Sequence, residues 1–179
     1  MPENPLVSII MNCYNGEKYL QEALDSIINQ TYKNWELIFW DNQSTDNSAN
    51  IVLSYNDHRI KYFYSKTHTV LYEGRNLAIE KSQGGYLAFL DVDDYWDLTK
   101  LEKQMLVFSK NSDVAIVYSN YYFKNEIKKT FKELNNNKLP EGMIVDELLR
   151  KNFMSLLTVL LNRGIINDNE KIFDSSLHI

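Results

Sequence analysis

Short apolar segments alternate with amphipathic segments along the first two thirds of the chain, and this alternation constrains its fold most strongly. The apolar segments predict strands over residues 7–11, 35–40, 60–64, 86–90 and 114–118. Apolar residues at helical spacing predict helices between them, over residues 19–30, 47–55, 74–82 and 98–109. Strands that alternate with helices are typical of crossover units, so we expect an α/β fold with a mostly parallel central sheet.

The pattern changes after Tyr118. Charged and aromatic residues over 121–133 favour an edge strand or a hairpin, followed by a polar loop over 135–142. A further helix is predicted over 143–151 and a last strand over 156–161. Within residues 121–133, three lysines are expected only to form a solvent-exposed face: Lys128, Lys129 and Lys132.

Charge and hydropathy exclude two classes of partner. The formal net charge of -5 argues against a protein that binds a nucleic acid backbone. The longest apolar stretch, residues 153–161, is interrupted by Ser155 and Thr158 and is shorter than the ~20 residues of a membrane span. The single cysteine, Cys13, suits a reducing compartment and is expected to be a packed thiol. We therefore expect a cytoplasmic protein with no transmembrane segment.

Polar residues follow three of the predicted strands. In a parallel sheet, ligands bind in the crevice outside the carboxyl ends of the strands, so these residues are the candidates for a site. They are Asn12 and Tyr14 after the first strand, Asp41 after the second, and Asp91 and Asp93 after the fourth. Asp41 is expected to contact a base or a ribose, whereas Ser44, Thr45 and Asp46 are expected to cap the next helix, as Asn15 caps the first.

The acidic cluster after the fourth strand indicates a metal. Three carboxylates in the four positions 91–94 repel one another directly behind an apolar strand. In an extended segment Asp91 and Asp93 share one side, so they can converge on a divalent cation. Mg²⁺ or Mn²⁺ prefers one or two carboxylates together with phosphate oxygens and water. The structural alternative is that Asp94 or Asp97 caps the following helix.

Other classes of acidic or nucleotide site fit less well. A calcium loop of the EF-hand type would need an oxygen ligand at Tyr95 and a glycine at Trp96. A dinucleotide dehydrogenase would need a Gly-x-Gly-x-x-Gly turn after the first strand, which is missing. The enzymatic runner-up is a phosphatase of the haloacid dehalogenase type, with Asp91 as nucleophile, although that family places its Asp-x-Asp after the first strand.

Four motifs in order resemble family 2 glycosyltransferases. They read VSIIMNCYN at 7–15, FWDNQSTD at 39–46, GRN at 74–76 and FLDVDD at 89–94. The resemblance covers residues 5 to about 110 and weakens after Tyr118, although IFDSSL at 172–177 is similar to a later segment of the family. It implies a GT-A fold, which is a Rossmann-like α/β/α sandwich. It also implies a nucleotide-diphosphate sugar donor, with UDP as the expected nucleotide, and a transfer that usually inverts the anomeric centre.

The resemblance also assigns roles by position. Asn12 and Tyr14 would line the nucleobase pocket, and Asp41 would accept a hydrogen bond from the base imide. Arg75 would lie beside the base or the phosphate. The remaining assignments place Asp91 and Val92 near the ribose and diphosphate, with Asp93 as the direct ligand of Mn²⁺ or Mg²⁺.

This chain departs from the family's pattern at two points. Asn42 stands where many members carry a second aspartate, and Asn12-Cys13 replaces a common Pro-Thr. These departures leave the base and ribose specificity open.

The resemblance treats residues 1–179 as a single domain, with a nucleotide-sugar-binding half over 5–118 and the start of an acceptor half over 119–179. The family's general base, an Asp in a Glu-Asp pair, is expected beyond Ile179, because Asp146-Glu147 has the reverse order. We therefore expect a fragment truncated at its C-terminus that binds a nucleotide diphosphate and transfers little sugar.

The acceptor is expected to be a glycan or a lipid-linked sugar in surface polysaccharide synthesis. The full-length protein would then be peripheral at the inner membrane face. A non-catalytic nucleotide-sugar-binding module is the alternative from a different functional class.

Overall fold

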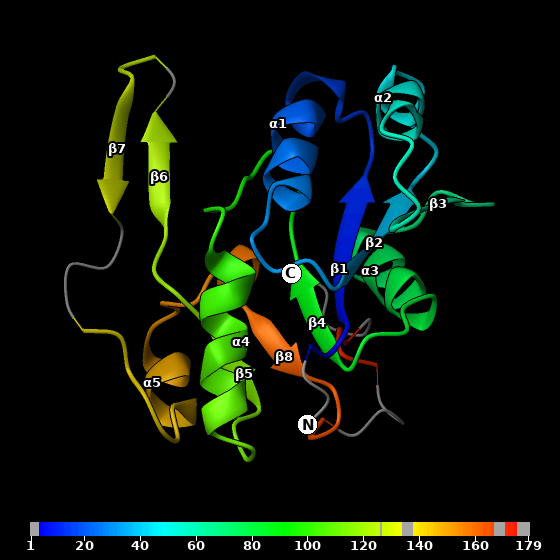
Figure 1. Ribbon diagram of the computed structural model, residues 1–179. Coiled ribbons are helices and arrows are strands. Elements are labelled where there is room, and N and C mark those ends of the chain that lie inside the picture. Colours follow the sequence, from blue (N-terminus) through cyan, green and yellow to red (C-terminus); the bar gives the residue numbers. More distant parts are fainter. Residues whose placement is uncertain (1–3, 126, 134–137, 167–170, 175–179) are drawn as a thin grey trace.

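The computed structural model describes residues 4–125, 127–133, 138–166 and 171–174, and most of them surround one sheet (Figure 1). Its strand order is β3-β2-β1-β4-β8-β5. The strands are β1 Val7–Cys13, β2 Trp35–Asp41, β3 Ile60–Tyr64, β4 Tyr86–Phe89, β5 Ile116–Val117 and β8 Leu160–Asn162. The first four run parallel to one another, while β8 is antiparallel to both of its neighbours. The predicted α/β fold with a mostly parallel sheet is confirmed.

Helices cover both faces of this sheet. They are α1 Glu17–Ile28, α2 Ser48–Ser54, α3 Leu71–Glu80 and α4 Lys100–Lys110, while a further helix, α5 Val145–Arg150, contributes no buried residue. On one face, Met11 packs in a core with Leu24 of α1 and Phe108 of α4. On the other face, Ile10 packs with Ile79 of α3. Because both faces are covered, every residue of β1 and β2 is buried, which explains their near-continuous apolar sequences.

The last predicted strand, residues 156–161, is only partly correct. Its first half is a 3-10 turn, η1 Leu156–Thr158, and the strand proper is β8. The turn forms because Thr158 donates from both its backbone N–H and its hydroxyl to the carbonyl of Ser155, at 3.0 and 2.6 Å. Strand β8 then enters the sheet between β4 and β5, so the fourth and fifth predicted strands are not neighbours.

Helix α3 begins three residues earlier than its predicted start at Gly74. The first turn closes when the Gly74 N–H donates to the carbonyl of Val70 at 3.0 Å. The helix therefore starts directly after the loop that follows β3.

The segment after Tyr118 forms a hairpin that is separate from the main sheet. Its strands are β6 Tyr122–Asn125 and β7 Thr130–Glu133, which pair only with each other. Figure 1 shows the hairpin standing apart from the main sheet, with β6 pointing in the same direction as β1. Helix α5 follows and buries none of its residues.

A buried carboxylate joins the amino ends of the central strands. Glu36 of β2 is 3% exposed and accepts hydrogen bonds from the Ser8 hydroxyl at 2.5 Å, from Lys61 Nζ at 2.5 Å and from the Gln83 N–H at 2.6 Å. Burial alone would raise the pKa of Glu36, but these bonds hold it below its ordinary value. The Gly84 N–H donates in turn to the Ser8 hydroxyl at 2.8 Å. This network fixes the turn before β4 against β1 and β2.

Candidate functional site

A hollow of about 400 Å³ lies at the carboxyl ends of β1 and β2. Its walls are Asn12, Cys13, Tyr14, Asn42, His68, Thr69, Val70 and Leu71. This is the edge at which a parallel sheet is expected to bind ligands. Two of the predicted site residues, Asn12 and Tyr14, therefore line the same hollow.

An exposed aromatic pair forms one wall. The Tyr14 side chain is 54% exposed, and its ring meets the His68 ring edge-on, with centroids 4.6 Å apart and planes at 72°. His68 Nδ1 lies 2.9 Å from the backbone carbonyl of Asn42, which orients the imidazole. A planar base can pack on such a ring. Sequence reasoning missed His68 because it lies in the irregular loop after β3.

Asn12 brings an unpaired buried acceptor to the hollow. Asn12 is 9% exposed, and its Oδ1 has no hydrogen-bond partner among the described residues. A buried acceptor without a partner costs about 1–3 kcal/mol, so this oxygen is suited to receive a donor from a ligand. The amide nitrogen is confined by α3, because a methyl group at Gly74 would lie 2.6 Å from Asn12 Nδ2.

Asp41 is fully buried, and both of its carboxylate oxygens are already hydrogen-bonded. Oδ1 accepts from the Ser44 N–H at 2.7 Å and Oδ2 from the Tyr62 hydroxyl at 2.7 Å. Burial, together with this carboxylate, raises the pKa of Tyr62. In this conformation Asp41 fixes the loop after β2, and contact between Asp41 and a base remains a prediction.

Asn42 locks the loop that carries His68. Its Nδ2 donates to the Thr69 carbonyl at 2.7 Å, and its Oδ1 accepts from the Thr69 N–H at 3.0 Å. A carboxylate has no hydrogen to donate, so an aspartate in this place could not make the first bond. The departure at position 42 thus has a structural role.

Of the three predicted caps in the loop after β2, only Asp46 bonds to the start of a helix, because Ser44 and Thr45 contact Asn15 instead. Asp46 accepts from the Ser48 N–H at 3.0 Å, as its predicted capping role requires, and also from the Glu17 N–H at 2.9 Å. The prediction that Asn15 caps α1 is wrong, because its Oδ1 accepts from the Thr45 N–H at 2.8 Å. Cys13 is 1% exposed, as expected for a packed thiol, and its burial raises the pKa of the thiol.

Arg75 is held between an acid and an aromatic ring. Its Nη2 lies 2.6 and 3.0 Å from the two carboxylate oxygens of Asp91. Its guanidinium carbon lies 5.5 Å from the centre of the Phe173 ring. Asn76 fixes Phe173 through its backbone, donating to its carbonyl at 2.7 Å and accepting from its N–H at 3.1 Å. The ion pair leaves Asp91 with part of its charge compensated.

The acidic segment turns instead of continuing the strand. Strand β4 ends at Phe89, and the Asp94 N–H donates to the Asp91 carbonyl at 3.1 Å. The premise that this segment is extended is therefore wrong. Val92 packs toward Gly16, where a methyl group would lie 2.9 Å from Val92 Cγ2. Asp93 is exposed and makes no hydrogen bond or ion pair with the residues that the structure describes.

Asp94, which the sequence offered only as part of the acidic cluster or as a helix cap, has a strongly shifted pKa. Burial, followed by the nearby charges of Asp93 and Asp91, raises the pKa of its carboxyl to about 6. It does not cap α4, which begins at Lys100, whereas Asp97 accepts from the Thr99 N–H at 2.9 Å. Negative charge is therefore concentrated at this turn beyond what Arg75 compensates.

The donor set fits a cation that brings its own oxygen ligands. Within the described part of the chain, no three His, Cys, Asp or Glu side chains form a ready metal site. Mg²⁺ and Mn²⁺ do not require such a cage, because they take one or two carboxylates together with phosphate oxygens and water. Asp93, with Asp91 beside it in the turn, supplies the one or two carboxylates that such a cation takes.

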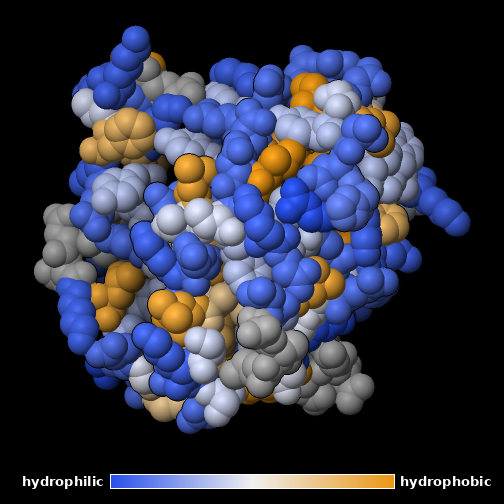
Figure 2. Space-filling view, viewed as in Figure 1, coloured by the Kyte–Doolittle hydropathy of each residue, from blue (hydrophilic) through white to orange (hydrophobic). Residues whose placement is uncertain are grey.

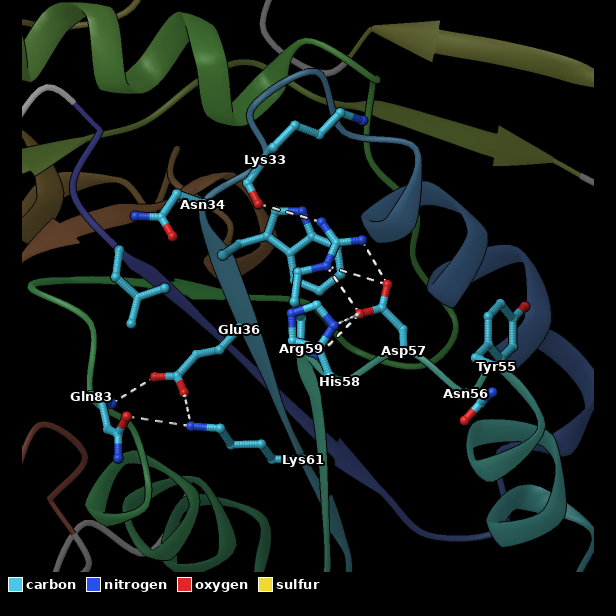
Figure 3. A pocket seen from close by; sticks show the side chains of 12 residues that line it. Lys33, Asn34, Glu36, Tyr55, Asn56, Asp57, His58, Arg59, Lys61 and Gln83 are labelled. Atoms are coloured by element: carbon cyan, nitrogen blue, oxygen red, sulfur yellow. Dashed lines mark hydrogen bonds and ion pairs between the residues drawn. The ribbon is translucent and has the colours of Figure 1, made fainter.

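A larger hollow, of about 750 Å³, lies at the opposite, amino end of β2 and β3 (Figure 3). Four of its charged side chains form two pairs: Asp57 with Arg59, whose Nη2 lies 2.6 Å from Oδ2, and Glu36 with Lys61. The Arg59 guanidinium also lies 3.7 Å above the Trp35 ring. These pairs fix the amino ends of the strands, so the smaller hollow remains the candidate site.

Because of the Asp57–Arg59 ion pair, we expect the free energy of unfolding to depend on pH. The hydrogen bond from Arg59 lowers the pKa of Asp57 to about 2. A carboxyl group whose pKa is lowered by folding stabilises the folded protein at pH values above its pKa in the unfolded chain, which is near 4. This stabilisation is lost as the pH falls through the pKa of the folded protein. Asp57→Asn should therefore cost about 1–2 kcal/mol at pH 7 and progressively less between pH 4 and pH 2.

Urea unfolding at a series of pH values measures this effect, with Asp113→Asn as a control at an exposed aspartate. A cost of Asp57→Asn that stayed constant from pH 7 to pH 3 would contradict the assignment.

Comparison with known proteins places the chain, by its sequence, in a family. The family described as glycosyl transferase family 2 matches residues 8–166. An Escherichia coli protein named UDP-Glc:alpha-D-GlcNAc-diphosphoundecaprenol beta-1,3-glucosyltransferase WfgD is 36% identical over 168 residues, which cover 90% of this chain and 62% of that protein. The putative teichuronic acid biosynthesis glycosyltransferase TuaG of Bacillus subtilis is 34% identical over 89% of this chain and 63% of its own length. The chain thus spans somewhat less than two thirds of these relatives.

Solved structures share the fold at lower identity. Residues 1–349 of Staphylococcus aureus TarS in complex with UDP-GlcNAc superpose with a TM-score of 0.70 and 22% identity, over 91% of this chain and 47% of that one. A mannosyltransferase from Pyrobaculum calidifontis, in complex with GDP-Man and Mn²⁺, gives 0.60 and 21% over 65% of this chain and 36% of its own. Among the described residues, no helix has the length and apolar character needed to cross a membrane.

Proposed function

Because the chain belongs to glycosyl transferase family 2, we propose that its strand-end hollow and acidic turn bind a nucleotide-diphosphate sugar, with UDP as the nucleotide. The observation that carries this proposal is the pairing of two features at one edge of the sheet. Tyr14 and Asn12 offer a ring and an unpaired buried acceptor, and the 91–94 turn concentrates negative charge. A base suits the first feature, and a metal-bound diphosphate suits the second.

The solved relatives support this choice of ligand. Structures of S. aureus TarS contain UDP and UDP-GlcNAc, and the P. calidifontis enzyme contains GDP-Man with Mn²⁺. Since both UDP and GDP occur among proteins of this fold, the uracil base remains a proposal for this chain. The family membership removes the main reason for considering the phosphatase alternative.

We assign the binding roles to the residues that line the site. Asn12 would accept a hydrogen bond from the nucleotide, and Tyr14 would pack against its base. Arg75, held by Asp91 and Phe173, would present a cationic side chain near the diphosphate. Asp93 would hold Mn²⁺ or Mg²⁺, a Lewis acid for the charge that develops on the departing diphosphate. Val92 would contribute its backbone near the ribose, since its side chain packs toward Gly16.

The proposed reaction is an inverting transfer to an acceptor hydroxyl. A general base must lie within hydrogen-bond reach of the acceptor, on the side of the sugar opposite the diphosphate. We assign this base to none of the described residues, and Asp146 and Glu147 lie on the exposed helix α5. In this proposal, residues 5–118 bind the donor and residues 119–179 begin the acceptor-binding part.

The acceptor is proposed from the named relatives. The E. coli relative WfgD is named for transfer to a sugar linked to diphosphoundecaprenol, and TuaG is named for teichuronic acid synthesis. We therefore propose a lipid-linked sugar as the acceptor in the synthesis of a surface polysaccharide. A protein that binds the donor without transferring it is the remaining alternative.

Calorimetry with UDP, GDP and UDP-sugars, each with and without Mn²⁺, tests the donor site. We expect heat with a UDP ligand and Mn²⁺, and its loss when EDTA is added. Tyr14→Ala should weaken this binding about tenfold, because stacking on an aromatic ring contributes about 1–3 kcal/mol per base. Tyr122→Ala, at a similarly exposed tyrosine of the hairpin, is the matched control. If no nucleotide diphosphate bound with any metal, the donor site would be refuted.

A further inference from the structure

The β6–β7 hairpin exposes an unusual concentration of large apolar side chains. Phe123 and Phe131 are each 61% exposed, Tyr122 is 65% exposed, and Ile127 in the turn is 95% exposed. Phe123 pairs in register with Lys132, and Phe131 with Lys124, so each face of the ribbon carries a phenylalanine beside a lysine. Burial within the described chain therefore does not explain these aromatic residues.

Three lysines of the same hairpin are exposed: Lys128, Lys129 and Lys132. None of them forms a salt bridge with another described residue. Residues 122–133 carry four lysines against two glutamates, Glu126 and Glu133, so the hairpin has a net positive charge in a chain whose formal net charge is -5. In Figure 2, the upper left corner, where Figure 1 places the hairpin, shows hydrophilic and hydrophobic surface side by side.

The hairpin is attached next to the candidate site. Lys124 of β6 lies 3.3 Å from Glu22 of α1, and its Nζ is 5.2 Å from the ring centre of Tyr95, the residue after the acidic turn. In Figure 1 the hairpin turn points in the same direction as the carboxyl ends of β1 and β4. The exposed turn and the mouth of the site therefore project toward the same side of the molecule.

We propose that the β6–β7 hairpin docks on an anionic phospholipid surface. Phenylalanine and tyrosine partition into the boundary between headgroups and acyl chains, while lysines are attracted to anionic headgroups. The acidic remainder of the protein is repelled by the same surface, which selects the hairpin as the side that faces it. Leu149 of α5 is also well exposed, at 83%, but Asp146 and Glu147 make that helix unsuited to an anionic surface.

The docking proposal goes beyond the proposed function. It rests on that function only in explaining why the protein would bind a membrane. A membrane-bound hairpin would turn the mouth of the donor site toward the lipid layer. A lipid-linked acceptor would then reach the site without leaving that layer. Vesicle binding itself requires neither nucleotide nor metal, so it is tested separately from the donor site.

Cosedimentation with phospholipid vesicles tests the proposal. We expect binding to vesicles that contain phosphatidylglycerol, weaker binding at high salt, and little binding to pure phosphatidylcholine. The triple variant K128E/K129E/K132E should lower partitioning by at least about 100-fold, since each basic residue near such a surface contributes roughly a fivefold gain and the new glutamates are also repelled. F123S/F131S should also lower it, by about tenfold or more.

Matched variants separate the hairpin from general effects. K33E/K81E/K110E changes the net charge by the same amount at exposed lysines elsewhere, and L149S removes an exposed apolar residue from α5. Both should bind vesicles much better than the hairpin variants do. Calorimetry with UDP and Mn²⁺ shows in parallel whether each variant keeps its donor site.

Three results would overturn the proposal. The first is a wild-type chain that fails to bind anionic vesicles, and the second is an equal loss in the two lysine triples. The third is a hairpin-dependent dimer in ultracentrifugation that accounts for the exposed aromatics, since a second copy of the chain would then cover them.

Discussion

Replacing Asp93 with asparagine is expected to weaken Mn²⁺-dependent nucleotide binding by about 100-fold or more. Asp93 is exposed at the turn after β4 and has no partner among the described residues, so its charge is available to a cation. Removing even an outer partner of a metal ligand typically costs 10–100-fold in affinity, and a direct ligand should cost at least as much. Calorimetry with UDP, at a fixed series of Mn²⁺ concentrations, measures the loss.

Two other aspartates provide the comparison. Asp113→Asn changes an exposed carboxylate outside the site and should leave binding unchanged. Asp91→Asn should weaken binding in a different way, because it removes the partner of Arg75 as well as a charge at the turn. Wild-type binding and an unchanged Mn²⁺ dependence in Asp93→Asn would show that the cation is held elsewhere.

Gly84→Ala is expected to reduce the free energy of unfolding by about 1–3 kcal/mol, the typical cost of forcing an extra carbon into a packed site. The added methyl group would lie 2.7 Å from the carbonyl oxygen of Leu6 and 2.7 Å from the Ser8 nitrogen. Both are backbone atoms of or beside β1, so they cannot rotate away as the end of a side chain would. The same shift would also disturb the hydrogen bond from the Gly84 N–H to the Ser8 hydroxyl.

The neighbouring glycine makes a stringent control. A methyl group at Gly85 would meet no atom within 4 Å, so Gly85→Ala should change stability by no more than about 0.5 kcal/mol. Urea denaturation of both variants gives the difference. Equal stabilities for the two variants would mean that β1 can move away from the turn at Gly84.

The sequence predicted the first half of the fold well because its signals there are local. The spacing of apolar residues in α1 and the unbroken burial of β1 and β2 both follow from short-range patterns. The place of β8 could not be predicted in this way. Its pairing with Tyr86 and Ile116 joins segments far apart in the chain, and no local pattern specifies that pairing.

The candidate site likewise contains residues that local sequence patterns predicted and contacts that they could not predict. The rule that ligands bind at strand ends led to Asn12 and Tyr14, and the structure places both in one hollow. The rule could not show that Tyr62 already occupies one oxygen of Asp41, because that contact depends on the register of β3 beside β2. Nor could it show the burial of Asp94, which arises from how the turn folds back.

The position of β8 also constrains the order in which the chain can assemble. During synthesis, β4 emerges long before β8, and within the described residues β5 pairs with no strand other than β8. Until residue 162 has left the ribosome, the growing sheet exposes the free backbone edge of β4, a template for pairing with another chain. Nascent chains that pause within the hairpin or α5 should therefore depend most on chaperones.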